Sequence, residues 1–532
     1  MPSTKKLLSI TNLKKYFPIA KSSIFQRQQY YVKANEDISL DIYEGETLGI
    51  VGESGCGKST LGRVLLQLYE QTAGTTMYYG MSRAELAPRY VTDTLRHAKR
   101  YISKLHAAQA RADAASAKVS QLGEAATFFD LQNKNLAVAE YQTAQAHIAK
   151  ILGGFLVRDT EQGAALLYRK ARLEEHAAAL SDRIRDIELM LDEAEGGTAD
   201  DGKPANASQL ARLKGRCDRL TRERDGLNAQ IREAEQSIAA IKQAHRDDVE
   251  FQRYEAMLDD GIDLARLKYS EMRILRKDLQ IIFQDPYSSL NPRFTIGQII
   301  EEGLVTHKFF RHGSPKMREH VVRTMKECGL QEYMLFRYPH QFSGGQRQRI
   351  SIARALAVHP KFVVCDECVS ALDVSIQSQI INLLQELKQK EHLTYMFISH
   401  DLSVVRYISD RICVMYLGNV VELADAATVF GDPRHPYTVA LLSSIPTTDM
   451  ESLKKERILL EGSIPSPVKP PDGCKFHTRC WMACDKCRRV PPPLAEIEPG
   501  HFVACHFPER KLDENGNYLF EMPKTEKKSA KE

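Results

Sequence analysis

The chain lacks long apolar runs: none of its 532 residues lies in a stretch near the roughly 18–20 residues that a membrane-spanning helix needs. Its N-terminus has no apolar segment long enough for a secretory signal. The formal net charge is only +4, which gives no clear electrostatic footprint for nucleic acid or a membrane surface. Eleven cysteines are too sparse for a disulfide scaffold, so most are expected to be reduced interior thiols. We therefore expect a cytosolic chain, or one held at a membrane through partners.

A glycine-rich segment is the strongest local signal. Residues 52–60 read GESGCGKST and fit the pattern G-x-x-x-x-G-K-[ST] of phosphate-binding loops. The apolar residues 48–51 precede it as a strand and residues 61–68 follow it as a helix, which is the context that the motif requires. In such a loop backbone N–H groups surround a polyphosphate, Lys58 neutralises its charge and Ser59 binds Mg²⁺. The residues expected to bind the nucleotide are Gly52, Glu53, Ser54, Gly55, Cys56, Gly57, Lys58, Ser59 and Thr60.

Further candidate residues stand at strand ends and at a helix start in the second half of the chain. Asp366 and Glu367 follow an apolar strand, where one carboxylate can hold Mg²⁺ and the other can take a proton from an attacking water. Ser343 and the two glycines after it open a helix and make a second anion site. Singly, such residues are usually plain caps, but their order along the chain points to one site. The set is Gln284, Ser343, Gly344, Gly345, Gln346, Asp366, Glu367 and His400.

Together these motifs resemble those of the ATP-binding subunits of ABC transporters, over about residues 7–80 and 268–430. The resemblance implies a P-loop α/β fold, an ATPase activity, and ATP with Mg²⁺ as cofactors. It also implies roles for three residues: Gln284 senses the γ-phosphate, Glu367 activates the attacking water, and His400 steadies the phosphate and that water.

The resemblance further implies a second ATPase subunit that meets this chain head to tail, so that each ATP lies between the P-loop of one subunit and residues 343–346 of the other. Phe17 aligns best with the aromatic residue that stacks on adenine, with Tyr16 as the runner-up, although either could be plain core. Two departures stand out. Phe342 replaces the commoner Leu, and Cys368 replaces the usual Pro, which loosens φ after the catalytic glutamate.

Three segments resemble the oligopeptide/dipeptide importers among these proteins, and in particular their second, F-type ATPase subunit. They are residues 52–63, residues 283–293, and residues 435–438 followed by 473–480. The resemblance implies uptake of oligopeptides or dipeptides across a bacterial inner membrane, with this chain peripheral on the cytoplasmic side. It implies as partners two membrane-spanning permease subunits and, indirectly, a periplasmic or lipid-anchored peptide-binding protein.

The Pro-rich C-terminal region carries a group of cysteines that suggests a metal in a cytosolic chain. Zinc-ribbon spacing would want two close C-x-x-C pairs, and only Cys484 with Cys487 makes one. All-cysteine ligation also suits an iron–sulfur cluster, so iron–sulfur, zinc and free thiols all stay open. In peptide importers this region resembles a [4Fe–4S]-binding tail. The residues that match it are Cys474, Cys480, Cys487 and Cys505.

A long segment of another kind interrupts the α/β pattern from about Glu85 to Leu267. It has apolar residues seven apart in two runs, separated by a Gly/Pro-containing break at 195–204. Two heptad arms around a tip predict an antiparallel coiled-coil hairpin, with an ordinary globular bundle as the alternative. The runs are Leu166, Leu173, Leu180 and Ile187, then Leu213, Leu220, Leu227, Ala234 and Ile241.

We therefore expect an α/β P-loop ABC ATPase domain with an inserted α-helical coiled-coil hairpin and a small Cys-rich C-terminal region. The expected parts are the first ATPase segment over 1–84, the insertion over 85–267, the second ATPase segment over 268–430, an importer-type C-terminal region over 431–512 and a disordered tail over 513–532.

Two other functions compete with this reading. A soluble ABC-type ATPase of DNA repair or chromosome maintenance would also interrupt its ATPase with coiled coils. The importer-like segments and the modest charge argue against it and predict no nucleic-acid partner. A scaffold that docks an unknown partner on the insertion is the third possibility.

Overall fold

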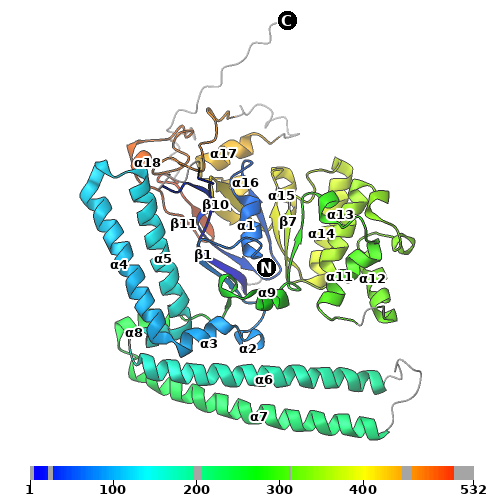
Figure 1. Ribbon diagram of the computed structural model, residues 1–532. Helices are drawn as coiled ribbons and strands as arrows, with labels where there is room; N and C mark the ends of the chain where they lie inside the picture. The colour runs from blue at the N-terminus through cyan, green and yellow to red at the C-terminus, as the bar shows by residue number, and fades with distance from the viewer. Residues whose placement is uncertain (1–4, 22–27, 196–206, 311–312, 446–457, 509–532) are drawn as a thin grey trace. The chain divides into compact units, whose positions relative to one another are not determined.

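The computed structural model describes residues 5–21, 28–195, 207–310, 313–445 and 458–508 (Figure 1). The chain forms two compact units: unit 1 is Met1–Thr76 with Arg273–Glu532, and unit 2 is Met77–Met272. The predicted insertion, 85–267, lies within the limits of unit 2. The predicted disordered tail and most of the predicted hairpin tip lie outside the described residues.

The main sheet of unit 1 has eight strands in the order β11-β12-β10-β9-β3-β8-β7-β6. Strand β3 lies between β8 and β9 and is parallel to both, so a strand from before unit 2 is inserted among strands from after it. Its residues are all buried, as expected of a strand covered on both faces. The strands are β3 (Thr47–Val51), β6 (Leu279–Ile282), β7 (Phe362–Asp366), β8 (Thr394–Ile398), β9 (Arg411–Tyr416), β10 (Asn419–Asp425), β11 (Ala495–Glu498) and β12 (His501–Val503).

A second sheet has the order β2-β1-β4-β5. Its long strands β1 (Lys6–Pro18) and β2 (Tyr31–Tyr43) pair antiparallel. Strand β4 (Ala73–Tyr78) runs from unit 1 into unit 2, where its last two residues pair with β5 (Ile262–Asp263).

The helices of unit 1 surround the main sheet or pack on one another beyond β7 (Figure 1). A single hydrophobic core runs from the sheet into α11, α12, α13 and α14. The helices are α1 (Lys58–Leu65), α10 (Pro286–Ser289), α11 (Ile296–Thr306), α12 (Pro315–Glu327), α13 (Gly344–Leu356), α14 (Val374–Glu391), α15 (Leu402–Ile408), α16 (Ala426–Gly431), α17 (Pro436–Ser443) and α18 (Asp485–Arg489), with 3₁₀ turns η4 (Glu332–Met334) and η5 (Pro339–Gln341).

Unit 2 is helical. Helix α4 packs against α5, and α6 packs against α7. Two cores stabilise it: one is centred on Phe155 and Phe251, and the other lies between α6 and α7 around Leu180, Ile184 and Leu220. The helices are α2 (Arg83–Leu86), α3 (Arg89–Arg96), α4 (Ala98–Leu122), α5 (Phe128–Leu152), α6 (Thr160–Glu195), α7 (Ala207–Ala244), α8 (Val249–Glu255) and the shared α9 (Tyr269–Leu275), with 3₁₀ turns η1 (Gly123–Ala125), η2 (Gly153–Leu156) and η3 (Leu264–Arg266).

The part of the chain that the structure describes contains no helix that is both long and apolar enough to span a membrane.

A buried carboxylate joins the N-terminal strands to the C-terminal region. Glu36 on β2 is only 8% exposed, and its carboxylate lies 3.2 Å from the ammonium of Lys475 and 3.8 Å from those of Lys14 and Lys33. The hydroxyl of Tyr16 donates to it at 2.5 Å. Burial alone would raise the pKa of Glu36, but the lysines and this hydrogen bond lower it to about 2.

Replacing Glu36 with Gln should therefore lower the free energy of unfolding by roughly 3–5 kcal/mol, because it removes the carboxylate from a group of buried cations. The pKa of Glu36 in the folded chain lies below its ordinary value of 4.5, so this stabilisation is present above that pH and is lost as the pH falls toward 2. Urea unfolding at pH 7 and pH 3 would measure both effects.

Glu44→Gln is the matched control, because Glu44 pairs at the surface with a Lys5 that is 66% exposed. It should change stability by less than about 1 kcal/mol. Equal losses in the two variants would contradict the assigned role of Glu36.

Candidate nucleotide-binding site

The phosphate-binding loop connects β3 to α1 and depends on two glycines with positive φ. A Cβ on Gly52 would lie 2.2 Å from the carbonyl oxygen of Met415, and one on Gly57 would lie 2.1 Å from that of Ala34. Their φ angles of 149° and 101° are also unfavourable for other residues. Lys58 is 5% exposed and its ammonium donates to the carbonyls of Gly52 at 2.8 Å and Glu53 at 3.1 Å, across the loop. The loop therefore holds a cation and a helix N-terminus in the place predicted for phosphate.

A hydrogen bond joins this loop to the end of β7. The hydroxyl of Ser59 donates to Oδ1 of Asp366 at 2.5 Å, and Asp366 is 1% exposed. A hydroxyl and a carboxylate are the hard oxygen ligands that Mg²⁺ prefers, so the pair fits the metal that the sequence predicts. Sequence reasoning missed Arg63, whose guanidinium lies 3.4 Å from Oδ2 of Asp366.

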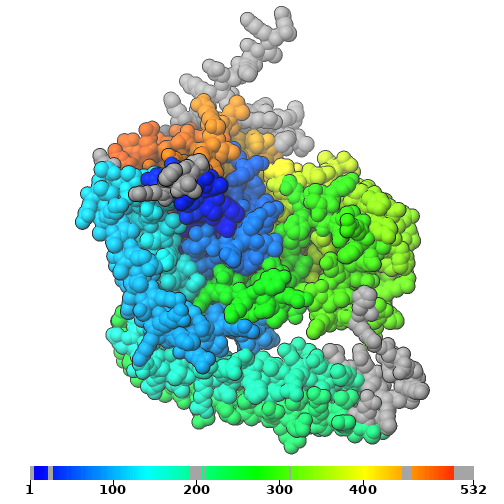
Figure 2. Space-filling view, in the orientation of Figure 1, coloured from blue at the N-terminus to red at the C-terminus, as the bar shows by residue number. Residues whose placement is uncertain are grey.

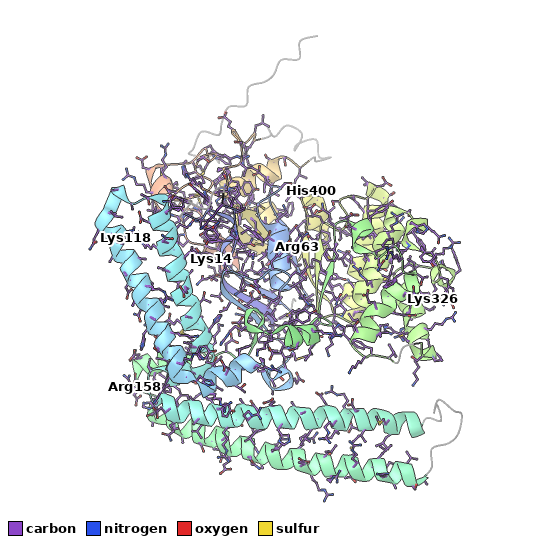
Figure 3. The ribbon with its side chains drawn as sticks, viewed as in Figure 1. Lys14, Arg63, Lys118, Arg158, Lys326 and His400 are labelled. Atoms are coloured by element: carbon purple, nitrogen blue, oxygen red, sulfur yellow. The ribbon has the colours of Figure 1, made fainter. Side chains whose placement is uncertain are left out.

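Three predicted catalytic residues lie together around Glu367, the residue that follows Asp366. The amide of Gln284 donates to Oε2 of Glu367 at 2.8 Å, and Nδ1 of His400 lies 3.6 Å from the same oxygen. Glu367 has a φ of 49°, a strained conformation that its N–H stabilises by donating to Ile398 at 3.0 Å. Figure 3 shows His400 and Arg63 in the central part of unit 1. The arrangement holds one carboxylate between an amide and an imidazole, where it can accept a proton from water.

The predicted second anion site begins α13. Ser343 caps this helix, accepting from the N–H of Gln346, whose side chain bonds back to the N–H of Ser343. A Cβ on Gly345 would lie 2.6 Å from Cγ2 of Ile376 on α14, so this glycine permits close helix packing. Figure 1 shows α13 beyond β7 from α1.

The two candidates for the adenine-stacking residue occupy different environments. Tyr16 is 4% exposed and its hydroxyl donates to Glu36, so it belongs to the core. Phe17 is half-buried, lies edge-on to Tyr69 at 5.4 Å between ring centroids, and has the ammonium of Lys15 4.6 Å from its ring centroid. Phe17 therefore remains the candidate.

The sequence profile described as "ABC transporter" matches residues 35–155 and 218–370, about half of the chain, and the profile "Oligopeptide/dipeptide transporter, C-terminal region" matches residues 421–487. The chain belongs to the ABC transporter family. The resemblance stated from the motifs is thus confirmed, and the chain is an ATPase that uses ATP and Mg²⁺.

Two relatives from Bacillus subtilis are similar to this ABC ATPase. One is named "Putative oligopeptide transport ATP-binding protein YkfD" and is 53% identical over 248 residues, which are 46% of this chain and 75% of the relative. The other, "Oligopeptide transport ATP-binding protein AppF", is 52% identical over 254 residues, 47% of this chain and 76% of the relative. Among solved structures, the dimeric post-hydrolysis state of the ATP-binding cassette MJ0796 bound to ADP and Pi has a TM-score of 0.41 at 16% identity, and the match covers 79% of this chain and 99% of that one.

The C-terminal region of this ABC ATPase contacts the P-loop directly. The sequence did not predict this contact. The guanidinium of Arg479 donates to both carboxylate oxygens of Glu53, at 2.7 and 3.1 Å, and its side chain is only 6% exposed. The backbone N–H of Glu53 donates to the hydroxyl of Tyr437 at 2.8 Å. Figure 2 shows the orange C-terminal region lying against the blue N-terminal segment of unit 1. Arg479 lies in the importer-like segment 473–480, but nothing in that local pattern indicated a contact with the P-loop.

The four predicted cluster ligands gather in this region. Cys480 and Cys505 are half-buried, and their burial, followed by the nearby thiols, raises the pKa of Cys480 to about 12 and that of Cys505 to about 11. Cys474 and Cys487 are among the thiols that contribute to both shifts. Within the described residues, however, no group of three or more His, Cys, Asp or Glu is arranged to hold a metal ion. The iron–sulfur cluster therefore stays a prediction.

Arg479→Ala should weaken binding of MgATP by about three- to tenfold, because a charge-assisted bidentate pair no longer fixes Glu53 in the P-loop. Titration calorimetry on the purified chain would measure the dissociation constant. Arg489→Ala, on an exposed arginine of the same region, should leave it unchanged. An unchanged dissociation constant in both variants would show that Arg479 has only a structural role.

Proposed function

We propose that this chain is the ATP-hydrolysing subunit of an importer that takes up oligopeptides or dipeptides across a bacterial inner membrane. The observation that carries the proposal is the match of residues 421–487 to the oligopeptide/dipeptide transporter C-terminal region, beside a complete set of ATPase motifs. The printed names of the relatives point the same way. The rival function in DNA repair or chromosome maintenance is not favoured, because it accounts for none of these similarities.

The geometry supports a role for each residue near the phosphates. Lys58 and Ser59 would contact the β- and γ-phosphates and Mg²⁺, with Asp366 completing the metal site. Glu367 would accept a proton from the attacking water, since its free carboxylate is already oriented by Gln284. Fixed charges around the γ-phosphate would then account for most of the rate.

The remaining anion site needs a second ATPase subunit. Ser343, Gly344, Gly345 and Gln346 would contact the ATP held by the P-loop of that subunit, since they begin a helix that is separate from α1 in this chain. Two membrane-spanning permeases would receive the conformational change at the cytoplasmic face. A periplasmic or lipid-anchored protein would deliver the peptide to them.

Two finer features complete the proposal. Cys474, Cys480, Cys487 and Cys505 would bind a [4Fe–4S] cluster, which the mutual proximity of their thiols supports. Residues 85–267 would form a helical insertion with a coiled-coil hairpin that docks an unknown partner. The heptad positions Leu180, Ile187 and Leu220 support the hairpin, because they are buried between α6 and α7.

Glu367→Gln should keep MgATP binding and lower turnover by roughly 10²-fold or more, because an amide cannot accept the proton. In membrane vesicles that contain the assembled transporter it should also abolish peptide uptake. Glu386→Gln, on an exposed carboxylate of α14, is the control and should preserve both activities. Wild-type turnover with the equivalent change in both ATPases would rule out Glu367 as the general base, and ATP hydrolysis without peptide uptake would contradict the importer.

Protein purified anaerobically should be brown, with a broad visible absorbance that dithionite bleaches, if the cysteines hold iron and sulfide. Cys480→Ser should abolish the colour. Cys217→Ser on α7 and Cys484→Ser, which changes a neighbouring thiol outside the predicted set, should both retain it. Colourless protein with one zinc per chain would contradict the iron–sulfur cluster and support the zinc alternative.

A further inference from the structure

Unit 2 contains a basic cavity that the ATPase site does not use. It has a volume of about 810 Å³, within the range of small-molecule sites. Its lining comes from helices α3, α4, α5 and α6 and from the segment that begins with η3, and α3 packs against both α5 and α6 (Figure 1). Every lining residue belongs to unit 2, so the cavity is complete without unit 1.

Positive charge dominates this cavity. Its charged residues other than histidine are Arg89, Arg96, Arg172, Arg266, Lys268 and the single acid Asp93. The carboxylate of Asp93 is already engaged, since it accepts the hydroxyl of Tyr101 at 2.5 Å and lies 3.4 Å from the imidazole of His97. Asp93 therefore offsets only part of the positive charge of the lining.

Other carboxylates offset part of this charge: Arg172 pairs with Glu175, and Asp263 lies 3.2 Å from the imidazole of His147 and acts on Arg266. Glu271 accepts the backbone N–H groups of Arg89 and Lys268, each at 2.8 Å. Within the described ranges, no carboxylate lies within ion-pair distance of the side-chain cations of Arg89, Arg96 or Lys268. Like charges held together around a cavity repel one another, and an anion would relieve that repulsion.

One arginine is fixed before any ligand binds. The guanidinium of Arg266 donates to the carbonyl of His147 at 3.0 Å and to the hydroxyl of Thr94 at 2.8 Å, and it lies 4.5 Å from the ring centroid of Tyr90. Burial lowers the pKa of Arg266, which is the cost of holding a desolvated cation here. A planar donor fixed in this way suits phosphate oxygens, which arginine binds through paired hydrogen bonds.

Aromatic side chains line the same cavity. Tyr90, Tyr101 and Tyr168 contribute to its wall beside the cations. Stacking on an aromatic ring is how proteins commonly bind the flat face of a nucleobase without reading its identity. A phosphorylated ligand that also carries a flat ring would use both features of the cavity at once.

We propose that this cavity of unit 2 is a second nucleotide site, which binds the phosphates of a nucleotide through Arg89, Arg266 and Lys268 and its base against the tyrosines. The site is independent of the P-loop, so it assigns to unit 2 the ability to sense a nucleotide rather than to hydrolyse it. It stands whether or not the importer proposal holds.

The test uses the full chain with Lys58→Ala, which weakens the P-loop site, and omits Mg²⁺. Fluorescent mant-ADP is the probe, and pyrophosphate and a single-stranded oligonucleotide are the competitors. We expect saturable binding of one mant-ADP per chain. The double substitution Arg89→Gln/Lys268→Gln should weaken it at least tenfold; both side chains are exposed, so the fold should be preserved.

Arg219→Gln/Arg232→Gln removes the same charge from exposed positions of α7 and is the matched control, which should bind as before. Tyr168→Leu should weaken binding of mant-ADP more than that of pyrophosphate. If both double variants lost affinity for mant-ADP equally, the loss would come from the general charge of the chain, and the proposed site would be overturned. Pyrophosphate or the oligonucleotide binding as tightly as ADP would overturn the nucleotide assignment in favour of a phosphate or nucleic-acid site.

Discussion

The hydrogen bond from Ser59 to Asp366, at 2.5 Å, joins residues that lie 307 positions apart in the chain. It forms only because β3 pairs in register with β8, and β8 in register with β7, so that the carboxyl ends of these parallel strands meet at one edge. A register shift of one residue would turn every side chain of a strand to its other face. The placement of Lys58, Glu367 and His400 depends on the same pairing, since each follows the end of one of these strands.

Unit 2 interrupts the ATPase sequence without disturbing this strand register. The chain leaves unit 1 and returns to it at neighbouring points. Met77 pairs with Asp263 and Tyr78 with Ile262, immediately inside the limits of unit 2. A segment whose ends are already paired imposes little further cost of loop closure on the rest of the fold, however long it is. Unit 2 has its own cores, around Phe155 and between α6 and α7, so its stability also comes largely from within.

The C-terminal region contacts the predicted nucleotide site as well as the N-terminal strands. Lys475 reaches the buried Glu36, while Arg479 and Tyr437 contact Glu53 of the P-loop. Lys475 and Arg479 lie in the segment between Cys474 and Cys480, so any group that the cysteines bind would act on the same short piece of chain. Burial makes these contacts strong, since a paired charge with little access to water is poorly screened.

The sequence alone determined the P-loop, the carboxylates at the end of β7 and the cap of α13, because each is a local pattern whose chemistry needs particular residues at fixed spacing. Of the heptad positions that it singled out, Leu180, Ile187 and Leu220 are buried between α6 and α7, while the coiled-coil hairpin stays a prediction. Only the tertiary structure decided that Tyr16 belongs to the core and that Arg479 donates hydrogen bonds to Glu53. It also decided that several cations of unit 2 line one cavity. These features join residues that are far apart in the chain and carry no local pattern, so only the packing of strands and helices can bring them together.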